Sequence, residues 1–183
     1  MVSNLDYVND GELLTEVGTT RVYKLNGELY MESGNKGNLI SAEEDLRNYI
    51  WQLGKKPQGN VLVLGLGLGF NVKYLLSLPK INSITVIEPS NDVIMCQQVF
   101  HQLDSNSDVT IICANFLKYM YEARSKFDFV FIDCYRQMDN TTWPLVADLI
   151  FAARSVCKVG GVTIGWLDGS ASEYWLKAFK MLF

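Results

Sequence analysis

The pattern of hydrophobic and polar positions changes near residue 58 of this 183-residue chain. Before that point, polarity partly alternates in two short runs, 20–25 and 28–32, which are separated by Asn26-Gly27. Alternation with a period of two is typical of strands, and Asn-Gly is the strongest two-residue signal for a hairpin turn. The sequence therefore predicts a β-hairpin over residues 20–32.

A helix is expected to follow this hairpin. Ser41 and Glu44 have the spacing of a capping box, in which Ser41 is the N-cap, and Gly54 is placed to end the helix after about Leu53. A short linker over 55–59 comes next. We therefore expect an N-terminal extension of hairpin and helix over residues 1–58 and a second unit over 59–183.

From residue 60 onward, apolar runs of strand length alternate with segments of helical periodicity. This alternation is typical of a parallel sheet that is covered by helices on both faces, the Rossmann-type doubly wound α/β fold with three layers. The strands are expected at 61–65, 83–88, 109–113, 128–133 and 161–166, and the helices near 69–78, 91–103, 115–124, 143–157 and 171–182. Strands that are almost continuously apolar suit central positions in such a sheet.

Three alternating glycines and a downstream acid are the main functional signal. Gly65, Gly67 and Gly69 follow the first apolar strand directly, and the second strand ends on Glu88. Glycines let the backbone turn and approach a ligand, while an acid at the next strand end can accept hydrogen bonds from both ribose hydroxyls. The alternatives are a simple tight turn and a solvated acid that contributes little to packing.

Position 70 narrows the class of ligand. A pyrophosphate-binding fingerprint reads G-x-G-x-x-G, with Gly or Ala at the last position, where this chain has Phe70. A bulky residue there hinders close approach of the helix to the strand. The pattern therefore favours a nucleoside without a pyrophosphate.

Polar and aromatic residues follow the third and fourth strands of the predicted sheet. Asn115 can offer an amide and Phe116 an aromatic face to a purine, although Asn115 could instead only cap the next helix. Asp133 can orient or deprotonate an amine or hydroxyl nucleophile, with Tyr135 beside it on the substrate side. Asp128, at the start of the same strand, is expected to be structural.

Composition excludes several classes of protein. Hydrophobic residues make up 49% and charged residues 20%, which is typical of a folded domain, and the net charge of -4 gives no cationic surface for nucleic acid. No apolar run reaches the length of a membrane span, and no basic segment leads into an apolar one at the start. We therefore expect a cytoplasmic protein whose partners include neither membranes nor nucleic acid.

Cysteine and histidine usage is sparse. Because the cysteines form no C-x-x-C pair, a zinc cluster or redox motif is not expected, and all four are interpreted as buried, reduced thiols. They are Cys96, Cys113, Cys134 and Cys157. His101 is the single histidine, so a Ser-His or Cys-His arrangement would depend on it alone. The sequence predicts no metal site.

Taken in order, these motifs resemble a known family. The segments 61–70, 86–89, 113–116, 127–133 and 160–162 are similar to those of the class I S-adenosylmethionine-dependent methyltransferase fold, and within it to the spermidine-synthase-like branch. The N-terminal hairpin and helix resemble the small β unit of that branch, so the resemblance covers nearly the whole chain.

The resemblance implies a role for each site residue. The glycines would wrap the methionine and ribose parts of S-adenosyl-L-methionine, or of its decarboxylated form, and Glu88 would hold the ribose diol. Asp133 matches the acid with which aminopropyltransferases activate the attacking amine. The implied cofactor-binding residues are Gly65, Gly67, Gly69, Glu88, Pro89, Asn115 and Phe116.

Departures from the branch favour methyl transfer over aminopropyl transfer. Aminopropyltransferases have Asp at the positions of Leu68 and Asn115, and they continue from the catalytic acid into a further acid and proline, where this chain has Cys134. Polyamines carry several positive charges and need several carboxylates. The expected function is thus methylation of a small-molecule acceptor.

Three other functions stay open. The first alternative is a polyamine aminopropyltransferase that uses decarboxylated S-adenosylmethionine. The second is a non-catalytic nucleoside-binding module, and the third an NAD-dependent oxidoreductase. The chain also ends where two further strands would begin in this fold, so we expect a shortened sheet, an edge covered by a partner chain, as in a homodimer, or a sequence that continues beyond this end.

Overall fold

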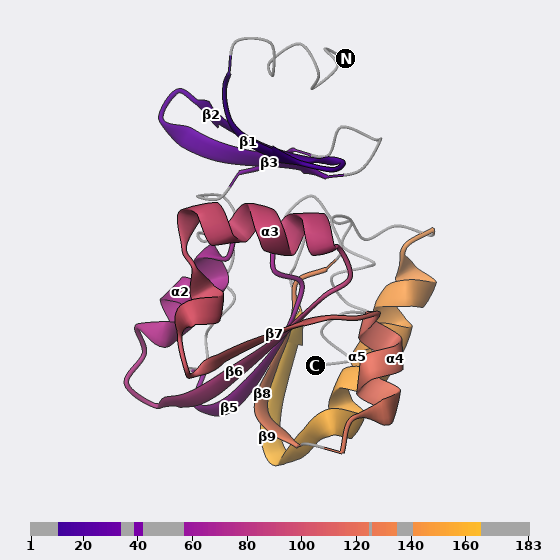
Figure 1. Ribbon diagram of the computed structural model, residues 1–183. Coiled ribbons are helices and arrows are strands. Elements are labelled where there is room, and N and C mark those ends of the chain that lie inside the picture. Colours follow the sequence, from indigo (N-terminus) through magenta and orange to yellow (C-terminus); the bar gives the residue numbers. More distant parts are fainter. Residues whose placement is uncertain (1–10, 34–38, 42–56, 125, 135–140, 166–183) are drawn as a thin grey trace.

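The fold contains two separate β-sheets. The computed structural model describes residues 11–33, 39–41, 57–124, 126–134 and 141–165. A four-stranded antiparallel sheet has the order β1-β2-β3-β4, and a five-stranded parallel sheet has the order β7-β6-β5-β8-β9 (Figure 1). The second sheet confirms the predicted doubly wound α/β fold.

The antiparallel sheet contains the predicted hairpin. Its strands are β1 (Glu12–Val17), β2 (Thr20–Leu25), β3 (Glu28–Ser33) and β4 (Leu39–Ser41). Asn26 and Gly27 join β2 to β3 with φ values of 52° and 88°, the positive values that a tight two-residue hairpin turn requires. The extension is therefore larger than the hairpin that the sequence predicted.

The sequence analysis did not predict β1, and the reason is physical. The pairing of β1 with β2 shifts between Leu13 and Thr15, which is the mark of a β-bulge. A bulge adds a residue and so interrupts the alternation on which strand prediction depends. Ser41, the expected N-cap, is the last residue of β4, and the helix predicted after it lies outside the described residues.

All five strands of the parallel sheet were predicted. They are β5 (Gly59–Leu64), β6 (Ile81–Glu88), β7 (Val109–Cys113), β8 (Phe127–Ile132) and β9 (Cys157–Gly165). The last begins four residues before the predicted bound, and its register against β8 shifts before Val162. The sheet order places β5 at its centre, beside β6 and β8.

Helices cover both faces of this sheet. They are α2 (Phe70–Leu76), α3 (Asn91–Phe100), α4 (Phe116–Glu122) and α5 (Trp143–Val156), with a 3-10 turn, η2 (Leu103–Ser105). Val61 and Val63 of β5 pack on the side of α2 and α3, whereas Leu62 and Leu64 pack on the side of α4 and α5 (Figure 1). Since all four are fully buried, the strand needs apolar residues at every position. The helix predicted at 171–182 lies outside the described residues.

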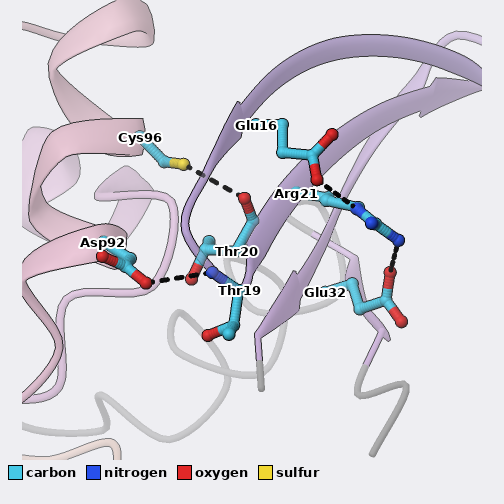
Figure 2. A network of polar contacts seen from close by, with 7 residues as sticks. All are labelled: Glu16, Thr19, Thr20, Arg21, Glu32, Asp92 and Cys96. Carbon is cyan, nitrogen blue, oxygen red and sulfur yellow. Dashed lines mark hydrogen bonds and ion pairs between the residues drawn. The ribbon is translucent and has the colours of Figure 1, made fainter. Parts of the chain in front are cut away.

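The antiparallel sheet is fixed to α3 at the turn between β1 and β2. The Thr19 N–H donates to Asp92 Oδ2 at 3.0 Å, and the Cys96 thiol donates to the Thr20 carbonyl at 3.8 Å (Figure 2). Gly18 has a φ of 56°, and a Cβ atom there would overlap the Asp92 carboxylate. The turn is thus shaped to fit the first turn of α3.

Substitution of Gly18 tests this contact. We expect Gly18→Ala to lower the free energy of unfolding by about 2–3 kcal/mol, because it adds a collision with Asp92 to the cost of a positive φ. Gly27→Ala is the matched control: its φ is also positive, but its Cβ would meet nothing within 4 Å, so about 1 kcal/mol is expected. Urea denaturation measures both, and equal losses would contradict the contact.

Candidate functional site

The ends of three neighbouring strands, β5, β6 and β8, meet at the carboxyl edge of the parallel sheet. Leu64 of β5 pairs with Ile87 of β6 and with Ile132 of β8. Beyond them, the Gly65 N–H donates to the Ile87 carbonyl at 2.9 Å, and the Asp133 N–H donates to the Leu64 carbonyl at 2.8 Å. The predicted residues Gly65, Glu88 and Asp133 therefore lie together, as expected for the ends of neighbouring parallel strands.

The glycine loop offers bare backbone at Gly67. That residue has a φ of 51°, and a Cβ atom built on it would meet nothing within 4 Å. Gly65 differs, because a Cβ atom there would overlap the Asp133 carbonyl oxygen. Leu66, between the two glycines, and Leu68, after Gly67, are buried in the core. Gly65 is thus required by the fold, whereas Gly67 leaves room beside the loop.

Glu88 is a buried acid that is bonded to the loop. The residue is 9% exposed; Oε2 accepts from the Leu66 N–H at 3.1 Å and Oε1 accepts from the Ser90 N–H at 2.9 Å. Burial raises the pKa of Glu88, and the two N–H groups act in the opposite direction. The interpretation as a solvated acid with little part in the fold is therefore wrong. Each oxygen still has a lone pair for a ribose hydroxyl.

Asp133 lies against an asparagine that the sequence analysis missed. Asn71 Nδ2, from the start of α2, donates to Asp133 Oδ2 at 2.8 Å. Asn71 is buried, and the only sequence signal for it was a polar amide at the start of an apolar helix. Burial raises the pKa of the half-buried Asp133 to about 7, although the bond from Asn71 lowers it. The carboxyl group can therefore both release and take up a proton near neutral pH.

Cys134 adds a third titratable group to this edge. Burial raises the pKa of its half-buried thiol, and the charges of Asp133 and Glu88 raise it further. The thiol therefore stays protonated at neutral pH. Among the described residues, no group of three or more His, Cys, Asp or Glu side chains is placed to hold a metal ion.

The residues expected near the adenine have structural partners. Asn115 Oδ1 accepts from the Lys118 N–H at 3.0 Å, so the capping interpretation is confirmed. Phe116 packs partly against the apolar cluster beneath α4 and α5, and Pro89 is exposed beside Glu88. Contact of these residues with a purine stays a prediction. Tyr135 lies outside the described residues.

Other predicted roles are settled by the structure. Asp128 accepts from the Asn60 N–H and from Lys158 Nζ, each at 2.8 Å, which confirms a structural role at the opposite edge of the sheet. All four cysteines are free, but of these only Cys96 is buried, so the interpretation of four buried thiols is wrong for the other three: Cys113 is exposed, and Cys134 and Cys157 are half-buried. The His101 ring lies edge-on to Phe70, with 4.6 Å between ring centroids. None of the described helices is long and apolar enough to span a membrane.

The pKa of Asp133 predicts a pH-dependent effect of Asp133→Asn on stability. Because the native carboxyl group titrates near 7 and the unfolded one near 3.8, native protein holds a proton that the unfolded chain releases between these values. The unfolding free energy of the wild type should thus fall between pH 4 and 7. The Asn variant has no titratable group at this position and does not lose stability in this way. Its free energy of unfolding relative to that of the wild type should therefore rise by about 1–3 kcal/mol from pH 4 to pH 8.

Asp128→Asn is the control with the opposite sign. Lys158 and the Asn60 N–H lower the pKa of Asp128, so its charged form stabilises the fold and the variant should be less stable than wild type at neutral pH. Thermal unfolding across pH measures both variants. A parallel pH dependence of the two would contradict the raised pKa of Asp133.

Comparisons with known proteins place this fold. No family model matches the chain, and no curated protein matches it. Among solved structures, spermidine synthase from Thermotoga maritima is 14% identical with a TM-score of 0.68, and the match covers 93% of this chain and 62% of that one. A SAM-dependent methyltransferase from Agrobacterium tumefaciens is 15% identical with a TM-score of 0.60, and the match covers 92% of this chain and 59% of that one.

A third similar structure carries a bound ligand. Fibrillarin from Aeropyrum pernix, solved with natively bound S-adenosyl-L-methionine, is 13% identical with a TM-score of 0.55, and the match covers 94% of this chain and 86% of that one. The chain thus spans about 60% of the length of the first two proteins. These likenesses confirm the resemblance at the level of the fold, which is that of the class I S-adenosylmethionine-dependent methyltransferases.

Proposed function

We propose that this chain is an S-adenosylmethionine-dependent transferase that methylates a small-molecule acceptor. The observation that carries the proposal is the bond of the buried Glu88 carboxylate to the glycine loop, with Asp133 packed against Gly65 at the same edge. This arrangement provides a ribose-binding acid, an open stretch of backbone and a proton acceptor. The ligand of fibrillarin, which shares the fold, supports the choice of nucleoside.

Each residue has a separate task in this proposal. Glu88 accepts hydrogen bonds from the ribose hydroxyls, and Gly67 lets the ligand approach the backbone. The bound sulfonium supplies an activated methyl carbon, so the protein needs no nucleophile of its own. Asp133 orients the acceptor and receives its proton, and holding the two reactants in line supplies most of the rate enhancement.

Aminopropyl transfer is the second candidate, because a spermidine synthase is among the similar structures. A multiply charged polyamine would need several carboxylates at the acceptor side. Leu68, which stands where aminopropyltransferases have an acid, is buried in the core. That position therefore cannot contribute charge to a polyamine site, which favours methyl transfer to a less charged acceptor.

Product analysis separates the candidates. The purified chain is incubated with S-adenosylmethionine or with its decarboxylated form, together with a panel of small amines and alcohols, and the nucleoside product is identified by mass spectrometry. S-Adenosylhomocysteine is the expected product, whereas methylthioadenosine would show aminopropyl transfer. Binding without either product would favour a non-catalytic module, and absence of binding would overturn the proposal.

A pair of glycine substitutions tests the ligand side of the loop. Gly67→Ala should lower the free energy of unfolding by only about 1 kcal/mol, the cost of a positive φ, but should weaken nucleoside binding at least tenfold because its methyl group enters the open space. Gly65→Ala should lower the free energy of unfolding by about 3 kcal/mol or more, because the added methyl group overlaps the Asp133 carbonyl. Calorimetric titration and thermal unfolding measure the pair. Unchanged nucleoside affinity in Gly67→Ala would show that the nucleoside does not bind beside the loop.

A further inference from the structure

Asn71 is a buried side chain that the proposed function has not yet used. Its residue is 6% exposed, and both polar atoms of its amide are hydrogen-bonded. Oδ1 accepts from the Val72 N–H at 2.8 Å, and Nδ2 donates to Asp133 Oδ2 at 2.8 Å. A buried amide with two specific partners is held in a single orientation.

The two bonds fix which end of the amide faces Asp133. If the amide were flipped, its NH₂ group would oppose the Val72 N–H and its oxygen would oppose the carboxylate, so both contacts would become repulsive. Asn71 therefore acts as a directional, uncharged donor to Asp133. An aspartate at position 71 could not do this while Asp133 is ionised.

Asp133 is fixed at its backbone as well. Its N–H donates to the Leu64 carbonyl at 2.8 Å, and its own carbonyl packs so closely on Gly65 that no side chain fits there. With Oδ2 held by Asn71, the remaining oxygen is Oδ1, to which none of the described residues donates a hydrogen bond. Within the part of the chain that the structure describes, one carboxylate oxygen is thus held by a side chain and the other is open to a bound molecule.

We propose that Asn71 is a positioning residue that holds Oδ2 of Asp133, so that Oδ1 is the atom that receives the proton of the acceptor. The proposal rests on the proposed function. In the step it describes, the acceptor's lone pair forms a bond to the methyl carbon, and the electrons of the carbon–sulfur bond pass to the sulfur. The proton of the acceptor passes to Oδ1 of ionised Asp133.

The surroundings of Asp133 make this uncharged donor important. Among the described residues, the titratable groups beside Asp133 at this edge are Glu88 from β6 and Cys134, next in the chain, and neither can supply a positive charge. The bond from Asn71 is the contact that lowers the pKa of Asp133 against its burial. Removal of that bond should move the titration of Asp133 to higher pH.

Asn71→Leu removes the donor while nearly keeping the shape of the side chain. We expect the titration midpoint of the Asp133 carboxyl carbon, followed by ¹³C NMR on Asp-labelled protein, to rise by about 1 pH unit. The acid limb of the kcat/KM profile should move in the same direction, and kcat should fall about 10- to 100-fold at neutral pH. Nucleoside affinity should stay within about threefold, because Asn71 does not contact the ribose-binding acid.

Two further variants serve as a rescue and as a control. Asn71→Ser retains a hydroxyl donor and should recover part of kcat, and it also serves if the Leu variant fails to fold. Asn60→Leu, at the opposite edge of the sheet, removes a polar contact with Ser83 and should leave the Asp133 midpoint unchanged. An unchanged Asp133 midpoint in Asn71→Leu, or a parallel loss of nucleoside affinity and kcat, would overturn the positioning role.

Failure of the proposed function would look different. A wild-type protein that forms no product with any acceptor would overturn the transferase proposal, and the positioning role with it. If the wild type turns over and Asn71→Leu turns over equally well with the same pH profile, only the positioning role is overturned. The NMR titration needs no turnover, so it reports the Asn71–Asp133 bond in either case.

Discussion

Asp133→Asn is expected to lower kcat by about 10²- to 10⁴-fold, the largest loss of any single substitution in the chain. The amide can still accept the hydrogen bond from Asn71, so the geometry of the site is retained, but it cannot take up the acceptor's proton. Nucleoside affinity should change by less than about threefold. Initial rates of product formation and calorimetric titration measure the two quantities separately.

Asp128→Asn is the matched control for this loss. It makes the same substitution on the same strand, at the edge of the sheet that faces away from the site, where Asp128 binds Lys158 and the Asn60 N–H. The control should keep the wild-type rate at a temperature where it is folded. If Asp133→Asn lost less than tenfold in kcat, proton transfer to Asp133 would have no part in the reaction.

Glu88→Gln is expected to weaken nucleoside binding by about 30- to 1000-fold, or about 2–4 kcal/mol. A neutral amide loses the charge-assisted bonds to the ribose hydroxyls. Its NH₂ group must also face either the Leu66 or the Ser90 N–H, so the free energy of unfolding should fall by about 1–3 kcal/mol. Affinity is therefore measured by calorimetry well below the unfolding temperature of the variant.

Glu122→Gln provides the control for charge alone. Glu122 is exposed at the end of α4, so its substitution changes the net charge by the same amount and should change neither affinity nor stability by more than about 0.5 kcal/mol. Retention of wild-type affinity in Glu88→Gln would place the ribose elsewhere and remove the main support for the proposed function.

The sequence predicted the parallel sheet well because its strands are buried on both faces. A continuous apolar run such as Val61 to Leu64 leaves little choice of structure once turns and amphipathic helices surround it. The antiparallel sheet was harder to predict. Its first strand contains a bulge between Leu13 and Thr15, and strand pairing there depends on partners that a local pattern does not contain.

The site was predictable where it follows from topology. Neighbouring parallel strands end at one edge, so Gly65, Glu88 and Asp133 had to lie together once the strands were assigned. Asn71 could not be foreseen, because its partner Asp133 is 62 positions away and no spacing rule links a helix start to a strand end at that distance. Asn115 had two chemically sound interpretations, and the sequence alone could not choose between them.

The attachment of the antiparallel sheet to α3 has a thermodynamic consequence for the pocket. The helix that holds the β1–β2 turn through Asp92 has Ser90 as its N-cap, and the Ser90 N–H donates to Glu88. A nucleoside bound at Glu88, as proposed, would therefore immobilise the same helix start to which the antiparallel sheet is attached. Since attachment of the sheet and binding of a nucleoside would each restrict this helix start, each should lower the entropic penalty of the other, and we expect the two to be cooperative without any change of shape.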